Sequence, residues 1–351
     1  MKRHKQLYPK VYSFGHLWFA WERARRGKAY TAAAAAFQEN LDEELVRLHD
    51  ELQAETWQPG PYRSFTIHEP KRRKISAAPF RDRVVHHALT MVLEPIYEAR
   101  FISDSYANRV GKGTHRALDR CTEFMRRYRY VMLCDVESFF PAIDHAILRE
   151  TLAMKIGDPA VLRLCEKIIA SGEGILTDEY RMRYFPGDDL FVVQRPRGLP
   201  IGNMTSQFWA NVYLDRLDQF VKHTLRVKGY LRYVDDFVLF ADDKADLWRW
   251  RDEIIGFLET LRLTIHMGSA QPRPVTQGLG FLGFTVFPDH RRLKRRKGIG
   301  YRRHLRGLLA DYRAERIPLE AVQASVMAWI GHVQHGDTWG LRKAVLRDVV
   351  I

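Results

Sequence analysis

The sequence predicts an α+β fold organised around a mostly antiparallel sheet, and two observations carry this prediction. Two β-rich runs, residues 231–234 and 237–240, flank the acidic pair Asp235-Asp236, an arrangement typical of a hairpin. A third apolar run covers residues 130–134. Amphipathic patterns elsewhere in the chain predict helices that pack around this sheet.

The N-terminal part is expected to be helical up to a strand that carries basic residues. Residues 30–57 contain five consecutive alanines, followed by leucines at three- and four-residue spacing, which predicts a helix. The segment Pro59-Gly60-Pro61 ends that pattern. A strand starting at residues 65–67 then leads to four adjacent cations, which are Lys71, Arg72, Arg73 and Lys74.

The rest of the chain shows further helical patterns. Apolar residues recur at helical spacing in residues 80–97, 208–221 and 319–330. Another helix is expected shortly after Pro141, with Asp144 as its N-cap. No repeat or low-complexity linker divides these elements, so we expect one continuous module.

The composition favours a globular protein with a polyanionic partner. The chain has 351 residues, of which 46% are hydrophobic and 28% charged, and its formal net charge is +14. Nine cations and no acidic residue lie between His290 and Ala310. Phosphate contact would explain this crowding of like charge, although a solvated face is the simpler alternative. The nine are Arg291, Arg292, Lys294, Arg295, Arg296, Lys297, Arg302, Arg303 and Arg306.

The cysteines and the hydropathy pattern indicate a cytoplasmic protein. Cys121, Cys134 and Cys165 are too few and too far apart for a disulfide framework or a zinc site. No stretch has the apolar length of a membrane span, and the basic N-terminus lacks the apolar core of a signal peptide. We therefore expect reduced thiols and no membrane partner.

Asp135, Asp235 and Asp236 are the candidate catalytic residues. Adjacent like charges are costly unless a cation neutralises them, so this set calls for a hard divalent metal with oxygen ligands. Three carboxylates at neighbouring strand ends could hold two ions roughly 3.5–4 Å apart, as in-line nucleotidyl transfer requires. Mg²⁺ suits these ligands best, and Mn²⁺ could replace it. Acidic pairs are also common in turns, so the pair alone could be structural.

Two other acidic pairs are expected to be structural. Asp242-Asp243 precedes an amphipathic pattern and suits a helix start. Asp188-Asp189 lies in a loop bounded by glycine and proline. Neither pair has strand-forming runs on both sides, which separates them from Asp235-Asp236.

Four segments in fixed order resemble the motifs of reverse transcriptases. They are Asp135 with Phe140, the segment 198–207, Tyr233-Val234-Asp235-Asp236, and the segment 280–284. The resemblance spans about residues 60–350. It implies a right-hand polymerase with fingers, palm and thumb, active as an RNA-directed DNA polymerase.

The resemblance also implies a division of the chain into regions. These are an N-terminal helical extension (1–58), fingers (59–110), a first part of the palm (111–171), a fingers insertion or loop (172–200), a second part of the palm (201–287) and a thumb (288–351).

Within this superfamily the chain looks most similar to the reverse transcriptases of diversity-generating retroelements. Most members have Gln-Gly followed by Ser-Pro in the fourth motif, whereas this chain has Ile201-Gly202 and Ser206-Gln207. Such enzymes copy a template RNA into error-prone cDNA for mutagenic retrohoming. They work with a small basic ring-forming protein, so the resemblance implies template RNA, an RNA/DNA duplex, deoxynucleotides and such an accessory protein as partners.

The resemblance assigns roles to several residues. Asp135, the backbone carbonyl of Val136, Asp235 and Asp236 would hold the two metal ions. Residues of the nucleotide pocket would be Lys71, Arg73, Phe140, Ile201, Gly202 and Gln207. Arg73 or Lys71 would grip the triphosphate, and a guanidinium suits this better because it binds phosphate oxygens bidentately.

Two pocket residues carry specific expectations. Phe140 lies where the family places an aromatic gate against the ribose 2′-hydroxyl, although Phe139 could serve as the packing residue or as the gate. Ile201 cannot make the hydrogen bonds of the usual glutamine, so discrimination between right and wrong base pairs should weaken. The resemblance places these errors opposite template adenines.

Three alternative functions stay open at this point. The chain could be an antiphage-defence reverse transcriptase, another group II intron-like or retron enzyme, or a catalytically idle RNA-binding scaffold. The three aspartates argue against an idle scaffold. A template repeat beside a variable repeat in the genome would favour the diversity-generating role.

Overall fold

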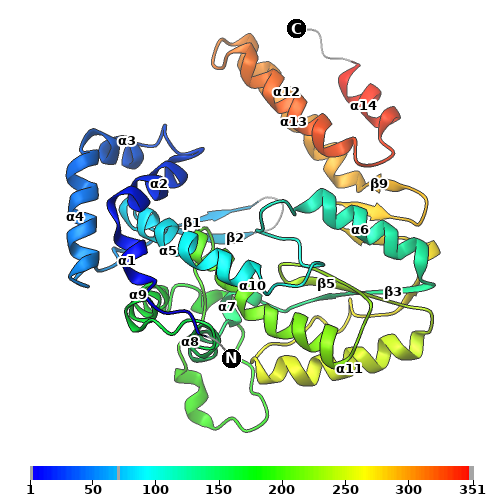
Figure 1. Ribbon diagram of the computed structural model, residues 1–351. Helices are drawn as coiled ribbons and strands as arrows, with labels where there is room; N and C mark the ends of the chain where they lie inside the picture. The colour runs from blue at the N-terminus through cyan, green and yellow to red at the C-terminus, as the bar shows by residue number, and fades with distance from the viewer. Residues whose placement is uncertain (1–2, 69–71, 348–351) are drawn as a thin grey trace.

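A four-stranded antiparallel sheet with strand order β4-β5-β3-β6 forms the core of the fold in the computed structural model of the protein. Figure 1 shows its strands β3 and β5 side by side among the helices. The structure describes residues 3–68 and 72–347. The α+β class predicted from the sequence is confirmed. The strands are β1 (Arg63–Ile67), β2 (Arg73–Ala77), β3 (Tyr130–Asp135), β4 (Gly229–Tyr233), β5 (Asp236–Ala241), β6 (Arg273–Pro274), β7 (Leu279–Phe281), β8 (Phe284–Val286) and β9 (Arg291–Leu293).

Helices surround this sheet, and helices are also the first and last elements of the described residues. They are α1 (Tyr8–Tyr12), α2 (Phe14–Arg25), α3 (Ala32–Glu39), α4 (Leu41–Gln53), α5 (Phe80–Glu98), α6 (Thr114–Arg127), α7 (Phe139–Ala142), α8 (His145–Ala153), α9 (Pro159–Ala170), α10 (Met204–Gln219), α11 (Lys244–Thr260), α12 (Arg295–Arg313), α13 (Leu319–Val333) and α14 (Trp339–Leu346). The patterns at 80–97, 208–221 and 319–330 therefore correspond to α5, α10 and α13.

Both faces of the central sheet are buried, which explains its almost continuous apolar runs. In β5, Phe237 and Leu239 join the large core that includes α10 and α11. The alternate residues Val238 and Phe240 face a second core with α6 and the β7–β9 sheet. Because side chains alternate between the two faces of a strand, β5 needs an apolar residue at each position from Phe237 to Phe240.

The prediction of one helix over residues 30–57 is wrong, because the chain breaks at Asn40. Asn40 has φ −116° and ψ 34°, between α3 and α4. The break lets the two helices bury separate faces. The Phe37 ring lies 5.3 Å from the Phe80 ring on α5, and α4 buries its own leucines in the core.

The expected caps and thiols are confirmed. The Asp144 carboxylate accepts hydrogen bonds from the first turn of α8, and Asp243 caps α11 in the same way. Asp188 forms an ion pair with Arg262 at 2.6 Å, and Asp189 caps a short 3₁₀ turn, so this acidic pair is structural. All three cysteines are buried and free.

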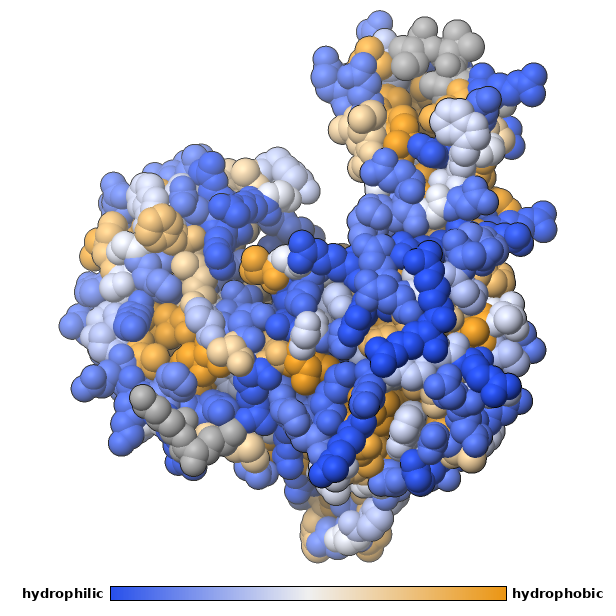
Figure 2. Space-filling view, turned by 45° about the vertical axis from the view of Figure 1, so that its right-hand side comes forward, coloured by the Kyte–Doolittle hydropathy of each residue, from blue (hydrophilic) through white to orange (hydrophobic). Residues whose placement is uncertain are grey.

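The C-terminal helices stand apart from the rest of the fold. Figure 2 shows α12–α14 projecting from the body, with a hollow between them and the N-terminal helices. These helices have a small core of their own around Leu305, Val322 and Val333. Within residues 3–68 and 72–347, no helix combines the length and apolar composition of a membrane span.

Candidate active site

The hairpin predicted around Asp235-Asp236 is confirmed and brings two of the candidate aspartates to neighbouring strand ends. Asp135 is the last residue of β3, and Asp236 is the first residue of β5. The two residues are direct partners in the antiparallel register. Asp235 lies in the turn beside them, and its carbonyl accepts a hydrogen bond from the Val136 N–H at 3.3 Å.

The turn that carries Asp235 has an unusual backbone. Val234 has φ +57°, in the left-handed region that a β-branched residue rarely adopts. Tight two-residue hairpin turns favour positive φ, which explains the conformation but not the choice of valine. Such strain persists only where surrounding contacts hold it in place, and it is often found at functional sites.

The charges around Asp235 favour a bound cation. Burial raises the pKa of the Asp235 carboxyl above its usual range, and the nearby Asp135 carboxylate adds to this rise. The positive charges of Arg73 and Arg232 oppose it. A negative charge that is buried beside another carboxylate would be stabilised by a divalent cation.

The donor chemistry of this site fits Mg²⁺, because carboxylates and a backbone carbonyl are hard oxygen ligands. Across residues 3–68 and 72–347, no three His, Cys, Asp or Glu side chains are arranged as metal ligands.

His266 lies beside Asp135, although no sequence motif singles it out. Its Nε2 is 3.9 Å from Asp135 Oδ2. Its backbone N–H also donates to the Asp135 carbonyl at 2.9 Å. This contact places the segment after α11 against the end of β3, which holds the Asp135 backbone on a second side.

Ile201 and Gly202 lie against the β1–β2 hairpin. The Ser76 N–H of β2 donates to the Ile201 carbonyl at 2.8 Å. Gly202 has φ +117°, and a Cβ atom at this position would lie only 2.9 Å from Cγ2 of Ile75. Glycine is therefore required here by both backbone conformation and space. Gln207 is exposed on the first turn of α10.

Asn203 holds Ile201 and Gly202 against the β1–β2 hairpin, and the sequence analysis assigned it no role. Its buried side chain donates to the carbonyls of Ser76 at 2.9 Å and Pro200 at 3.2 Å, and it accepts from the Ala78 N–H at 3.1 Å. The candidate nucleotide pocket is thereby tied to β2, the strand that carries Arg73.

The two phenylalanines of α7 differ in how deeply they are buried. Phe139 is buried in the core, whereas Phe140 is partly exposed, with their ring centroids 5.5 Å apart. The Phe140 carbonyl accepts from the Leu199 N–H at 2.9 Å, so Phe140 lies next to the segment that leads to Ile201. Arg73 begins β2 and is close enough to influence Asp235, while Lys71 lies outside the described residues.

Eight of the nine cations between His290 and Ala310 are exposed on β9, α12 and the turn between them. Arg291 differs from the others. Its guanidinium forms an ion pair with Asp119 at 2.8 Å and donates to Thr122 at 2.7 Å, both on α6. Arg291 therefore joins β9 to α6, and we leave it out of the proposed phosphate contacts.

Comparison with known proteins identifies the class. The reverse transcriptase (RNA-dependent DNA polymerase) family matches residues 67–286, and the chain belongs to this family. This finding agrees with the polymerase architecture expected from the sequence. The chain carries an RNA-directed DNA polymerase domain.

Individual relatives refine this placement. The chain is 28% identical to protein YkfC of Escherichia coli over 75% of this chain and 74% of YkfC. It is 27% identical to the group II intron-encoded protein LtrA of Lactococcus lactis over 51% of this chain, which spans only 28% of LtrA. Among solved structures, a Candida tropicalis telomerase matches with a TM-score of 0.48 and 12% identity, over 70% of this chain and 59% of the telomerase. The sequence relatives place the chain near the group II intron reverse transcriptases.

Proposed function

We propose that the protein copies template RNA into cDNA by adding deoxynucleotides to a primer 3′-hydroxyl. The observation that carries this proposal is the register that pairs Asp135 with Asp236 next to the Val234-Asp235 turn. Asp135, Asp235, Asp236 and the Val136 carbonyl would hold two Mg²⁺ ions. The chemistry that these ions would supply is activation of the 3′-oxygen and binding of the triphosphate with its leaving pyrophosphate.

Residues around this site would bind and orient the nucleotide. Arg73 supplies positive charge close to Asp235, where a triphosphate oxygen could accept its guanidinium N–H groups. Phe140 would lie beneath the sugar and exclude a 2′-hydroxyl. The exposed cations of β9 and α12 would contact the phosphate backbone of the template–primer duplex.

The diversity-generating role is the finer part of the proposal. It rests on Ile201-Gly202 and Ser206-Gln207, and on the apolar side chain that Ile201 presents where most relatives have glutamine. We infer error-prone copying, most frequent opposite adenine, with mutagenic retrohoming as its outcome. The proposed partner is a small basic accessory protein.

A second candidate is a reverse transcriptase related to group II introns but without directed mutagenesis. The similarity to the intron-encoded LtrA protein favours it. The two candidates share their polymerase chemistry and differ in the errors they make. An error spectrum can therefore separate them.

The test is extension of a DNA primer on a defined RNA by the purified protein, with cDNA sequencing. It would be run with and without any small basic protein that a neighbouring gene is found to encode. Mg²⁺-dependent extension with errors concentrated at adenines supports the whole proposal. Accurate cDNA supports the intron-related alternative, and no extension on any primed RNA contradicts both.

A further inference from the structure

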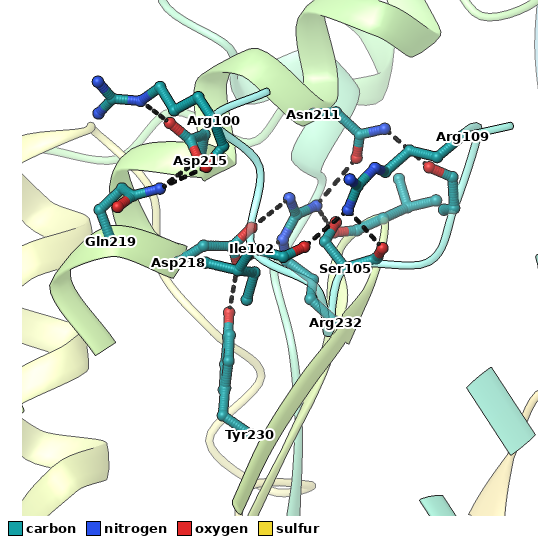
Figure 3. A network of polar contacts seen from close by, with 12 residues as sticks. Arg100, Ile102, Ser105, Arg109, Asn211, Asp215, Asp218, Gln219, Tyr230 and Arg232 are labelled. Carbon is teal, nitrogen blue, oxygen red and sulfur yellow. Dashed lines mark hydrogen bonds and ion pairs between the residues drawn. The ribbon is translucent and has the colours of Figure 1, made fainter. Parts of the chain in front are cut away.

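Arg232 is a fully buried cation in β4, the strand that leads to the Val234-Asp235 turn. Its guanidinium binds the Asp218 carboxylate bidentately, from Nε to Oδ1 at 2.8 Å and from Nη2 to Oδ2 at 2.7 Å (Figure 3). Both side chains are 0% exposed. Asp218 lies on α10, so this ion pair joins the helix to β4 beneath the turn.

Neighbouring groups fix the orientation of this pair. The Tyr230 hydroxyl donates to Asp218 Oδ1 at 2.7 Å. Arg232 Nη1 donates to Asn211 Oδ1 at 3.1 Å, and the Asn211 amide in turn donates to the Ala107 carbonyl at 2.8 Å. The guanidinium is held on several sides and has little freedom to rotate.

The same Nη1 atom also donates to the Val234 carbonyl at 2.9 Å. This carbonyl belongs to the peptide group between Val234 and Asp235, so the bond fixes the plane from which Asp235 extends. It also supports the strained φ of +57° at Val234. The backbone of Arg232 is held as well, because its N–H donates to the Asp104 carbonyl at 2.9 Å and its carbonyl accepts from Tyr106 at 3.0 Å.

We propose that Arg232 is a positioning residue for nucleotidyl transfer, which holds the Val234-Asp235 peptide so that Asp235 and Asp236 are presented beside Asp135. This inference rests on the proposed polymerase function. It gives Arg232 a task that a purely structural ion pair lacks. A buried pair contributes little net stability compared with apolar residues of the same volume, so stability alone gives weak reason for a charge here.

Arg232→Lys tests this role, because lysine keeps the charge but cannot reach Asp218 and the Val234 carbonyl with a planar fork. Single-nucleotide primer extension would be measured across a Mg²⁺ titration, together with thermal melting and template–primer affinity. We expect extension about 10–100-fold slower, a higher Mg²⁺ requirement, and unchanged template binding. A folded variant with the wild-type rate and Mg²⁺ dependence would overturn the proposal.

Arg100→Lys is the matched control. Arg100 forms an ion pair with Asp215, also on α10 and also part of Figure 3, and Gln219 donates to the same Asp215 at 2.9 Å. No described contact of this pair reaches the Val234-Asp235 turn. We expect extension and Mg²⁺ dependence within about twofold of wild type. An equal loss in both lysine variants would overturn the proposal, because the effect would then follow from disturbing α10.

A second variant separates positioning from stability. Arg232→Met with Asp218→Leu and Tyr230→Phe replaces the polar group with apolar side chains of similar size. A folded triple variant should remain about 10–100-fold slow, because nothing binds the Val234 carbonyl. Recovery of wild-type extension, or loss of folding in both this variant and Arg232→Lys, would show that Arg232 serves only stability. An inactive wild type would instead contradict the proposed function itself.

Discussion

Asp135 and Asp236 are register partners on adjacent antiparallel strands, and this single pairing brings residues about a hundred positions apart to one point. The same register also places Asp235 next to this pair, because Asp235 directly precedes Asp236 in the turn. A hairpin shifted by one residue would direct these side chains to the opposite face. The site therefore depends on the β3–β5 register as much as on the aspartates themselves.

Removing the Asp235 charge should stabilise the metal-free protein. Burial and the neighbouring Asp135 raise the Asp235 pKa, so the folded state binds this proton more tightly than the unfolded state. Its contribution to stability is therefore lost as pH rises through the raised pKa. We expect Asp235→Asn to melt at a higher temperature than wild type at pH 7 without metal, and to gain less stability from added Mg²⁺. A lower melting temperature would contradict this explanation.

The α7 phenylalanines should have separate effects. Phe140→Ala should raise ribonucleotide incorporation relative to deoxynucleotides, because the partly exposed ring would no longer exclude a 2′-hydroxyl. Phe139→Ala should mainly destabilise the fold, by about 3–5 kcal/mol for a buried aromatic ring. Competition assays and thermal melts on both variants measure this. Full sugar discrimination by Phe140→Ala would show that the gate lies elsewhere.

The basic surface of α12 should account for part of the salt dependence of RNA binding. Replacing Arg295, Arg296 and Lys297 with alanine should weaken duplex binding. The slope of log K against log salt is negative, and its magnitude should decrease by about 0.7–0.9 for each phosphate contact that is lost. The control removes three exposed arginines elsewhere, which are Arg47, Arg163 and Arg249. Equal slopes for the two triple variants would favour a solvated surface.

Ile201→Gln should lower misincorporation modestly. One neutral hydrogen bond contributes about 0.5–1.5 kcal/mol, or roughly three- to tenfold in discrimination. The Ile201 carbonyl is held by Ser76 whichever side chain is present, so the backbone of the pocket should survive. Sequencing cDNA from both proteins measures the effect. Identical spectra from two active enzymes would mean that other residues set fidelity.

The sequence predicted the strands and acidic hairpin because local patterns determine them. The apolar runs beside Asp235-Asp236 require burial on both faces, and Asp144 and Asp243 carry the local signature of helix caps. Such local patterns do not predict contacts between residues that lie far apart in the sequence. Arg232 lies within the β-rich run 231–234, and a charge inside such a run is a signal for a buried acidic partner. Nothing local distinguishes Asp218 as that partner.

Three other features also required three-dimensional information. Asn203 binds β2 from a loop more than a hundred residues away, and Arg291 has internal partners on α6 that its basic neighbours lack. The break at Asn40 was missed because helix propensity is a weak predictor where packing decides. In each case, contacts distant in sequence determine the outcome.

The most direct test of the account is RNA-templated primer extension by wild type and by Asp235→Asn with Asp236→Asn, in parallel with template binding. These carboxylates would hold metal and touch no template backbone. We expect Mg²⁺-dependent cDNA synthesis by the wild type, and no synthesis but nearly unchanged RNA binding by the double variant. Wild-type extension rates in the double variant would contradict the central claim.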